Sequence, residues 1–215
     1  MSITILTMDE IKKNFPNLTS TQLKQLNMLG DLYEDWNSKI NVISRRDINM
    51  LYEHHVLHSM VISKVINFKA GTKVLDVGTG GGFPGLPLAI LFPNCQFTLV
   101  DSVGKKLKVI DSVVNSIGLT NVTTIHSRAE DLDGKFDFVV SRAVTRLDNI
   151  WSWVNTKISP VNNNSLANGL IYLKGGDISG EIPNKVVVQQ WPLDKWIDNT
   201  FYRDKIIVYI ASSKQ

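Results

Sequence analysis

The chain has 215 residues, of which 43% are hydrophobic and 20% charged, and its formal net charge is +3. This balance is that of a globular protein and excludes wholesale disorder and low-complexity classes. The single cysteine, Cys95, excludes a disulfide framework and a cysteine-rich zinc module, and indicates a reducing, cytoplasmic setting. The first residues, with Asp9 and Glu10, resemble neither a signal peptide nor a membrane-spanning helix, and the most apolar stretch, residues 83–92, is too short to cross a bilayer.

Residues 1–70 are predicted to form a helical extension. Thr7 and Thr19 are each followed three residues later by a glutamate or glutamine, which is the spacing of a capping box at a helix start. Apolar residues then recur every three or four positions over residues 23–40 and predict one long amphipathic helix. Asp47 is expected to cap a third helix.

From residue 71 onward, short β-branched segments alternate with helical ones. The expected strands are 73–78, 96–102, 122–127, 136–143 and 170–175. Helices are expected over 85–92 and 105–117, and this alternation predicts a mostly parallel sheet with helical crossovers. Segments 185–193 and 205–212 have no room for a helix between them and predict an antiparallel hairpin, and 159–168 is interpreted as a surface loop.

A glycine-rich loop follows the first expected strand. Asp76, Gly78, Gly80 and Gly82 fit the acid-x-G-x-G-x-G pattern of S-adenosylmethionine sites in full. A carboxylate suits the ammonium group of that cofactor, whereas it would repel a pyrophosphate. The dinucleotide pattern G-x-G-x-x-G also matches from Gly80, but it starts two residues late and contains Pro84. The loop therefore favours a methyl donor over a dinucleotide, and a tight turn without a ligand stays open.

Two further positions point to a nucleoside. Asp101 ends the second expected strand, where an acid can accept hydrogen bonds from ribose hydroxyls. Ala129 and Glu130 follow the third strand, where the loop is expected to meet the adenine. The alternatives are a helix cap for Asp101 and a solvated side chain for Glu130.

Other catalytic chemistries find little support. His54 and His58 are spaced i, i+4, but the H-E-x-x-H order of a zinc site is missing, so we expect no metal. Cys95 stands at the start of the second strand, the wrong end for a nucleophile near the glycine loop. Methylation of an unprotonated ring nitrogen, such as guanine N7, needs neither a nucleophilic cysteine nor a base. Arg142, after the fourth strand, is placed to contact the cofactor or guanine O6, or to form a salt bridge within the fold.

Several motifs occur in a family-specific order along most of the chain. They are WNSKINVI (36–43), EHHVLHS (53–59), VLDVGTGGGFPGLPLAI (74–90), LVDSVGKKLKVI (99–110), SRAEDL (127–132), SRAV (141–144) and LKGG (173–176). In these motifs the chain resembles the bacterial 16S rRNA (guanine-N7)-methyltransferase G family, also called glucose-inhibited division protein B. The phenylalanine-proline-glycine after the glycines is far more specific than the general methyltransferase pattern.

The resemblance implies an α/β fold of the Rossmann-like class I S-adenosylmethionine-dependent methyltransferases, with a core over 71–215 that follows the helical extension 1–70. It implies S-adenosyl-L-methionine as donor, S-adenosyl-L-homocysteine as product, and N7 of one guanine in 16S rRNA (position 527 in the conventional count) as acceptor. The expected partner is 16S rRNA or the small ribosomal subunit, with no membrane and no obligate protein partner.

The expected site residues follow from motif position or from the general methyltransferase pattern. The cofactor-binding set is Asp76, Gly78, Gly80, Gly82, Phe83, Asp101, Ala129, Glu130 and Arg142. Arg142 and Arg128 are the candidate catalytic residues, and Asn41 and His55 are candidates for the RNA or substrate side.

The chain departs from the family pattern at a few positions. His54 and His58 stand where the family has an arginine and an aspartate, and Arg146 stands where a small or apolar residue is expected. Any family role of the first two is therefore in doubt here, and Arg146 is a candidate phosphate contact. The lysines at 105, 106 and 108 are a second candidate for phosphate contacts, or simply a solvated face.

Three rival functions stay open from sequence. A small-molecule methyltransferase would use the same loop with a closed apolar substrate pocket. A non-enzymatic RNA-binding assembly factor would keep the fold without turnover. A dehydrogenase would require the less well matched dinucleotide pattern.

Overall fold

The computed structural model describes residues 2–212, with side chains described from residue 8 onward. Helix α1 spans Ser2–Asn14 and α2 spans Ser20–Lys39. The predicted capping box at Thr19 is confirmed, because its hydroxyl accepts from the Gln22 amide at 3.2 Å while the Thr19 amide donates to the Gln22 side chain at 2.9 Å. The predicted helix start at Thr7 is wrong, since Thr7 lies within α1.

The third predicted helix is a chain of short, irregular helical pieces. The 3₁₀ turn η1 (Ile48–Met50) leads into the π-helix η2 (Leu51–Leu57), a single α-turn α3 (His58–Met60) and a second 3₁₀ turn, η3 (Val61–Lys64). Asp47 stands at the first N-cap position but makes no capping hydrogen bond, so its predicted role is wrong. Its carboxylate binds two histidine rings of η2 instead. π-Helices are rare and often mark functional sites.

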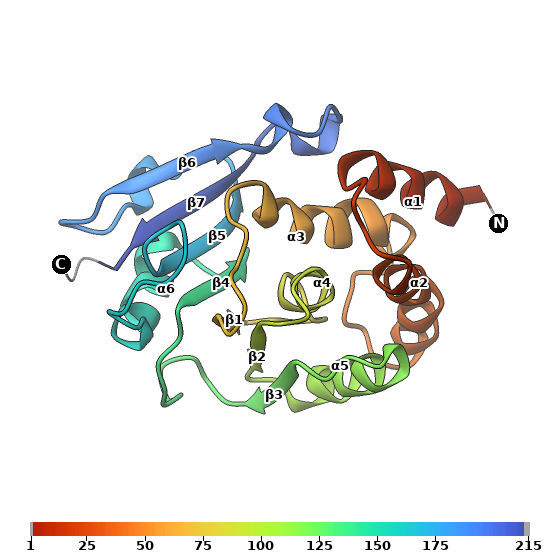
Figure 1. The fold of residues 1–215 in the computed structure, drawn as a ribbon, viewed down its shortest axis with the longest axis horizontal. Coiled ribbons are helices and arrows are strands. Elements are labelled where there is room, and N and C mark those ends of the chain that lie inside the picture. The colour runs from red at the N-terminus through yellow and green to blue at the C-terminus, as the bar shows by residue number, and fades with distance from the viewer. Residues whose placement is uncertain (1, 213–215) are drawn as a thin grey trace.

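A seven-stranded sheet runs through the molecule in the order β3-β2-β1-β4-β5-β7-β6 (Figure 1). The strands are β1 (Lys73–Val77), β2 (Gln96–Asp101), β3 (Val122–His126), β4 (Phe138–Arg142), β5 (Gly169–Gly175), β6 (Val188–Pro192) and β7 (Lys205–Ala211). The first five are parallel, and β7 pairs antiparallel with both β5 and β6. The predicted parallel sheet and C-terminal hairpin are therefore confirmed, with β6 at the edge.

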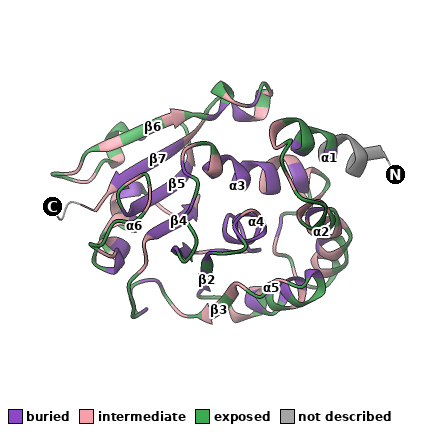
Figure 2. Ribbon diagram, viewed as in Figure 1, coloured by how far each residue is buried: buried purple, intermediate pink, exposed green. Residues whose placement is uncertain are grey.

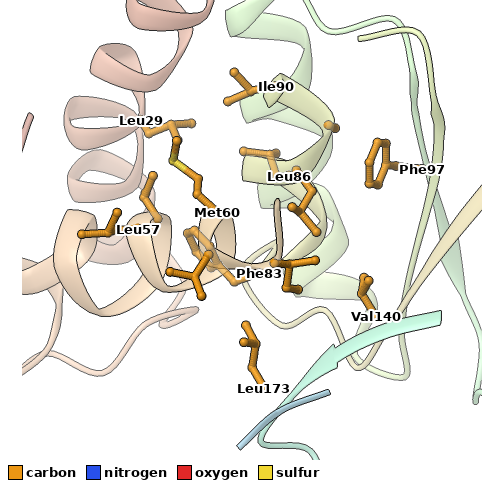
Figure 3. Close-up of a cluster of buried hydrophobic side chains, with 14 of the residues drawn as sticks. Leu29, Leu57, Met60, Phe83, Leu86, Ile90, Phe97, Val140 and Leu173 are labelled. Atoms are coloured by element: carbon orange, nitrogen blue, oxygen red, sulfur yellow. The ribbon is translucent and has the colours of Figure 1, made fainter. Parts of the chain in front are cut away.

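Helices cover the two faces of the sheet unequally. α4 (Gly85–Leu91), α5 (Gly104–Ile117) and the helices of the N-terminal segment lie on one face, whereas α6 (Leu147–Val154) covers the other (Figure 1). Buried residues of α2, η2, α3 and α4 join in one hydrophobic core over the first face. Figure 2 colours these elements by burial, and Figure 3 shows the side-chain packing around Phe83. The N-terminal helices and the glycine loop thus share a core, and the division at residue 70 stays a prediction.

The loop and membrane predictions can also be compared with the structure. Residues 159–168 contain no regular element and are mostly exposed, as expected for a surface loop. Its last residue, Asn168, is buried, and its side-chain amide donates to the carbonyls of Ser159 and Val161. Over the described residues 2–212, no helix combines the length and the apolar character needed to cross a membrane.

Candidate functional site

The glycine loop connects β1 to α4 and depends on backbone conformations that only glycine adopts readily. Gly78, Gly80 and Gly82 have φ values of 64°, 58° and 93°. A Cβ atom at Gly78 would also lie 2.5 Å from a methyl group of Val144, closer than real Cβ atoms approach. Both the backbone conformation and the available space therefore require glycine at position 78.

Asp76 supports this loop from inside the fold. Its Oδ2 accepts hydrogen bonds from the Thr79 hydroxyl at 2.6 Å and the Gly85 amide at 2.8 Å, which ties β1 to the start of α4. Burial raises the pKa of Asp76 to about 7, outweighing these hydrogen bonds. Its Oδ1 is buried without a hydrogen-bond partner among the described residues. Asp76 lies outside the lining of the adjacent pocket.

A pocket of about 420 Å³, the first pocket, opens at the carboxyl ends of β1, β2, β3 and β4. Its lining includes Gly78, Asp101, Lys106, Arg128, Ala129, Glu130, Arg142, Val144 and Trp153. Ten residues were predicted to bind the cofactor or to act in catalysis, and six of them line this pocket: Gly78, Asp101, Arg128, Ala129, Glu130 and Arg142. This is the edge where ligands bind in open α/β sheets.

Asp101 anchors the first pocket. Its Oδ2 accepts from the Gly80 amide at 2.9 Å, its Oδ1 accepts from the Val103 amide at 2.8 Å, and Lys106 lies 3.8 Å away. The bond to Val103 closes a turn before α5, whose N-cap is Val103 and has no side-chain capping hydrogen bond, so the helix-cap alternative for Asp101 is wrong. The bond to Gly80 ties Asp101 to the glycine loop. Each carboxylate oxygen can accept a further hydrogen bond, as a ribose diol requires.

The first pocket fits an adenosyl group. A carboxylate at the end of β2, the small buried Ala129 after β3 and the missing Cβ of Gly78 leave a space with a polar end and an apolar wall at Trp153. A nucleoside site requires polar groups at fixed points beside apolar surface, and the lining of the first pocket supplies both. Asp101, Ala129 and Glu130 are the residues that would hold it.

Gly80, Gly82 and Phe83 lie beside the first pocket without lining it. Gly82 and Phe83 are buried. The Phe83 ring lies 5.2 Å from the Tyr33 ring and 5.3 Å from the His55 ring, centroid to centroid, and the guanidinium of Arg142 lies 5.4 Å from its centroid. Phe83 therefore joins the loop to the N-terminal helices and to Arg142.

Arg142 ends β4 and turns its side chain toward η2. Nη1 donates to the His54 carbonyl at 2.8 Å and Nη2 lies 2.7 Å from His55 Nδ1. Burial lowers the pKa of Arg142 to about 10, so the side chain stays charged at neutral pH. No carboxylate among the described residues forms a salt bridge with it, which removes the salt-bridge alternative there.

A second pocket, of about 370 Å³, lies on the other side of Arg142. Its lining is Asp47, His54, His55, His58, Arg142, Ala143, Leu173, Lys174, Gly175, Phe201 and Lys205. Arg142 and Ala143 line both pockets. The His54 and Phe201 rings stack at 3.8 Å, and the Lys205 ammonium lies 3.8 Å from the Phe201 centroid. The second pocket thus combines cations, imidazoles and a stacked aromatic ring.

Sequence reasoning missed several members of these pockets. Asp47 was expected only as a helix cap, and Lys205 only as the first residue of the expected strand 205–212. Phe201 lies in the loop between the two hairpin segments. Tyr33 was assigned to a helix face, yet its hydroxyl donates to the Gly81 carbonyl of the glycine loop. Some members had a signal, since Lys174 belongs to the LKGG motif, Val144 to SRAV and Lys106 to LVDSVGKKLKVI.

Other predicted residues lie at the surface. Asn41 is exposed, as are Lys105 and Lys108. Arg146 pairs with Asp148 at 3.0 Å and donates to the Gly180 carbonyl. Cys95 is buried just before β2, at the opposite end of that strand from Asp101, as predicted.

Two solved structures similar to this chain are a methyltransferase and a protein in complex with the methyl donor. A precorrin-6y C5,15-methyltransferase from Geobacter metallireducens has a TM-score of 0.55 at 13% identity, covering 81% of this chain and 92% of its own. A variant of MtNAS in complex with S-adenosylmethionine has a TM-score of 0.54 at 11% identity, covering 87% and 74% respectively. At these identities the likeness establishes the fold, and it confirms the predicted class I methyltransferase architecture.

Sequence comparison gives a closer relationship. The family model described as rRNA small subunit methyltransferase G matches residues 22–177. The ribosomal RNA small subunit methyltransferase G of Cytophaga hutchinsonii is 50% identical over 206 residues, covering 95% of this chain and all of the relative. That of Phocaeicola vulgatus is 54% identical over 207 residues, covering 96% and 99%. The chain belongs to the rRNA small subunit methyltransferase G family, a family of S-adenosylmethionine-dependent enzymes.

Proposed function

We propose that this protein transfers a methyl group from S-adenosyl-L-methionine to N7 of a single guanine in 16S rRNA. The observation that carries the proposal is the shared wall: Arg142 and Ala143 line both the first and the second pocket. Methyl transfer is a direct displacement, so the enzyme mainly has to hold donor and acceptor in line. Two adjoining pockets with one common wall meet that requirement.

The first pocket is proposed to hold the donor, which supplies an electrophilic methyl group on a sulfonium. Asp101 accepts from the ribose hydroxyls, and Ala129 and Glu130 contact the adenine. Gly78 keeps the backbone close to the ligand because no side chain intervenes. Asp76 acts through the loop, since it lies beneath it and outside the pocket lining.

The second pocket is proposed to hold the acceptor guanine. Its N7 carries an in-plane lone pair and no proton, so no general base is needed. The lone pair forms the new N–C bond while the electrons of the C–S bond stay on sulfur, and the product base carries the positive charge. Two of the five N–H donors of Arg142 are engaged by His54 and His55. The remaining donors suit O6, which neighbours N7 on the same edge of guanine.

Charged residues around the pockets favour a nucleic acid over a small apolar substrate. Lys174 and Lys205 line the second pocket, and Arg128 stands exposed at the first. Exposed cations outside the pockets, Arg45, Arg46, Lys105 and Lys108, are available to phosphates. The proposed partner is therefore 16S rRNA or the small ribosomal subunit, and the proposed location is the cytoplasm.

Transfer of a radiolabelled methyl group tests the proposal. The purified protein is incubated with labelled S-adenosyl-L-methionine and either small subunits or deproteinised 16S rRNA from cells that lack this gene. We expect label as 7-methylguanine at one guanine, with lower transfer at higher salt. Label at another base or atom, or none while the cofactor binds, would overturn the proposed acceptor.

A further inference from the structure

Asp47, His55 and Arg142 form a continuous hydrogen-bonded chain between the N-terminal segment and the end of β4. Asp47 Oδ2 lies 2.5 Å from His55 Nε2, and His55 Nδ1 lies 2.7 Å from Arg142 Nη2. The other oxygen of Asp47 lies 2.5 Å from His54 Nδ1. A single carboxylate therefore holds two neighbouring imidazoles of η2.

The hydrogen-bonded chain from Asp47 through His55 to Arg142 allows only one arrangement of its protons. A guanidinium has no acceptor, so Arg142 must donate and His55 Nδ1 must accept. The proton of neutral His55 then lies on Nε2 and is donated to Asp47. This arrangement makes His55 an acceptor aimed at one nitrogen of the guanidinium.

Burial and charge keep His55 in that neutral form. Burial is the larger cause and the charge of Arg142 the second, and together they lower the pKa of His55 to about 4 although Asp47 acts in the opposite direction. Burial works to raise the pKa of Asp47, but the hydrogen bonds from His54 and His55 outweigh it and lower the pKa. His58, Lys174 and Lys205 also line this pocket. The neighbouring His54 also acts against protonation of His55.

We propose that Asp47 and His55 are positioning residues, which fix the guanidinium of Arg142 between the first and second pockets. The inference rests on the proposed function in that Arg142 belongs to the transfer site. It assigns a task to the irregular helical segment 47–64. The π-helical turn places His54 and His55 next to each other on one carboxylate, while the His54 carbonyl takes the other end of the guanidinium.

The first experiment tests the hydrogen-bonded chain directly and does not depend on enzymatic activity. Nitrogen-15 NMR of the histidine rings in the full protein reports which nitrogen of His55 carries the proton and its pKa. We expect a neutral ring protonated on Nε2 at neutral pH, and a higher pKa in Arg142→Met, because the neighbouring charge is gone while Asp47 stays. If Arg142→Met does not fold, Asp47→Asn is expected to lower the pKa of His55 further. A proton on Nδ1, or a pKa that neither substitution moves, would overturn the proposal.

The second experiment compares two substitutions of His55. Asparagine places an acceptor near the position of Nδ1, and glutamine places a donor near the position of Nε2. If His55 acts through Arg142, His55→Asn keeps more single-turnover methyl transfer than His55→Gln, which we expect to lose about tenfold, the equivalent of one charge-assisted hydrogen bond. Affinity for S-adenosyl-L-methionine should stay within about twofold of wild type in both.

A double-mutant cycle decides between positioning and a general structural effect. His55→Gln should cost little further activity in an Arg142→Lys background, where the guanidinium fork is already absent. Equal losses in both backgrounds would contradict the proposal. If the wild-type protein transfers no methyl group to rRNA, the proposed function fails, whereas the NMR result still decides whether the hydrogen-bonded chain exists.

Discussion

The first and second pockets share Arg142 but are assembled differently. The first is lined mostly by residues that end or directly follow β1, β2, β3 and β4, so most of its side chains are positioned by the nearest strand. The second takes its lining from residues 47–58, 142–143, 173–175 and 201–205, which meet only in the folded chain. A change in the first should therefore act through the glycine loop, and a change in the second through contacts between distant segments.

Asp76, the buried support of the first pocket, gives the largest expected effect, seen as a pH dependence of stability. Its pKa is about 7 in the fold and 3.8 as the ordinary value, so the folded state keeps a proton that the unfolded state loses between these values. Its contribution to stability is full below about pH 4 and is lost as the pH rises through 7, by up to about 4 kcal/mol. Urea unfolding of wild type and Asp76→Asn between about pH 4.5 and 8 should show the difference shrinking in that direction.

The exposed Asp177 provides a control of opposite sign for Asp76→Asn. Hydrogen bonds from Ser179 lower the pKa of Asp177, so its contribution is retained at neutral pH and lost in acid. Asp177→Asn should therefore leave the wild-type loss between pH 5 and 8 in place. An Asp76→Asn protein with the same pH profile as wild type would show that Asp76 is ionised in the fold.

Gly78→Ala should disrupt the wall of the first pocket at the glycine loop and thereby weaken cofactor binding. The new Cβ would lie 2.5 Å from Val144 on a backbone with φ of 64°, so either the loop or Val144 must move. We expect affinity for S-adenosyl-L-methionine to fall by about 100-fold or more, measured by calorimetry. Gly71→Ala is the matched control, because Gly71 has φ of 83° with no atom within 4 Å of the added Cβ. The control should cost about 1 kcal/mol of stability and leave cofactor affinity unchanged.

Phe201→Ala tests the second pocket in isolation. The substitution removes the ring that stacks on His54 at 3.8 Å and lies under Lys205. We expect kcat/KM for the rRNA substrate to fall about tenfold, with cofactor affinity preserved. Phe15→Ala is the control, since Phe15 also has a lysine over its ring, Lys64 at 4.4 Å, but lines neither of the two pockets. Equal effects on cofactor and rRNA would contradict the separation of the pockets.

The difference in assembly explains what could be predicted from sequence. The positions of Gly78, Asp101 and Ala129–Glu130 followed from counting along the chain, because a strand end and the loop after it are local features. The sheet, its crossovers and the C-terminal hairpin were predictable for the same reason. Phe201 could not be found in this way, because nothing near it in sequence indicates that it will stack on His54.

Asp47 shows a different limit of sequence reasoning. An aspartate before a helical segment is a standard capping signal, and the prediction at Asp47 followed that rule. In the fold each oxygen of the Asp47 carboxylate binds one imidazole, of His54 or of His55, and neither oxygen accepts a capping hydrogen bond from a backbone amide. The irregular helical geometry of η2 that brings these rings together has no recognisable period in the sequence.

Tyr33 gives the smallest expected effect and tests whether the first pocket is as local as its lining suggests. Its buried hydroxyl, on α2, donates to the Gly81 carbonyl, and burial raises its pKa, so the phenol stays protonated and able to donate. Tyr33→Phe leaves that carbonyl without this donor and should weaken cofactor binding about fivefold. Tyr52→Phe is the matched control: its hydroxyl also bonds backbone groups of α2, but it does not contact the glycine loop. If both substitutions lower stability but only Tyr33→Phe lowers cofactor affinity, a distant helix holds the first pocket as well.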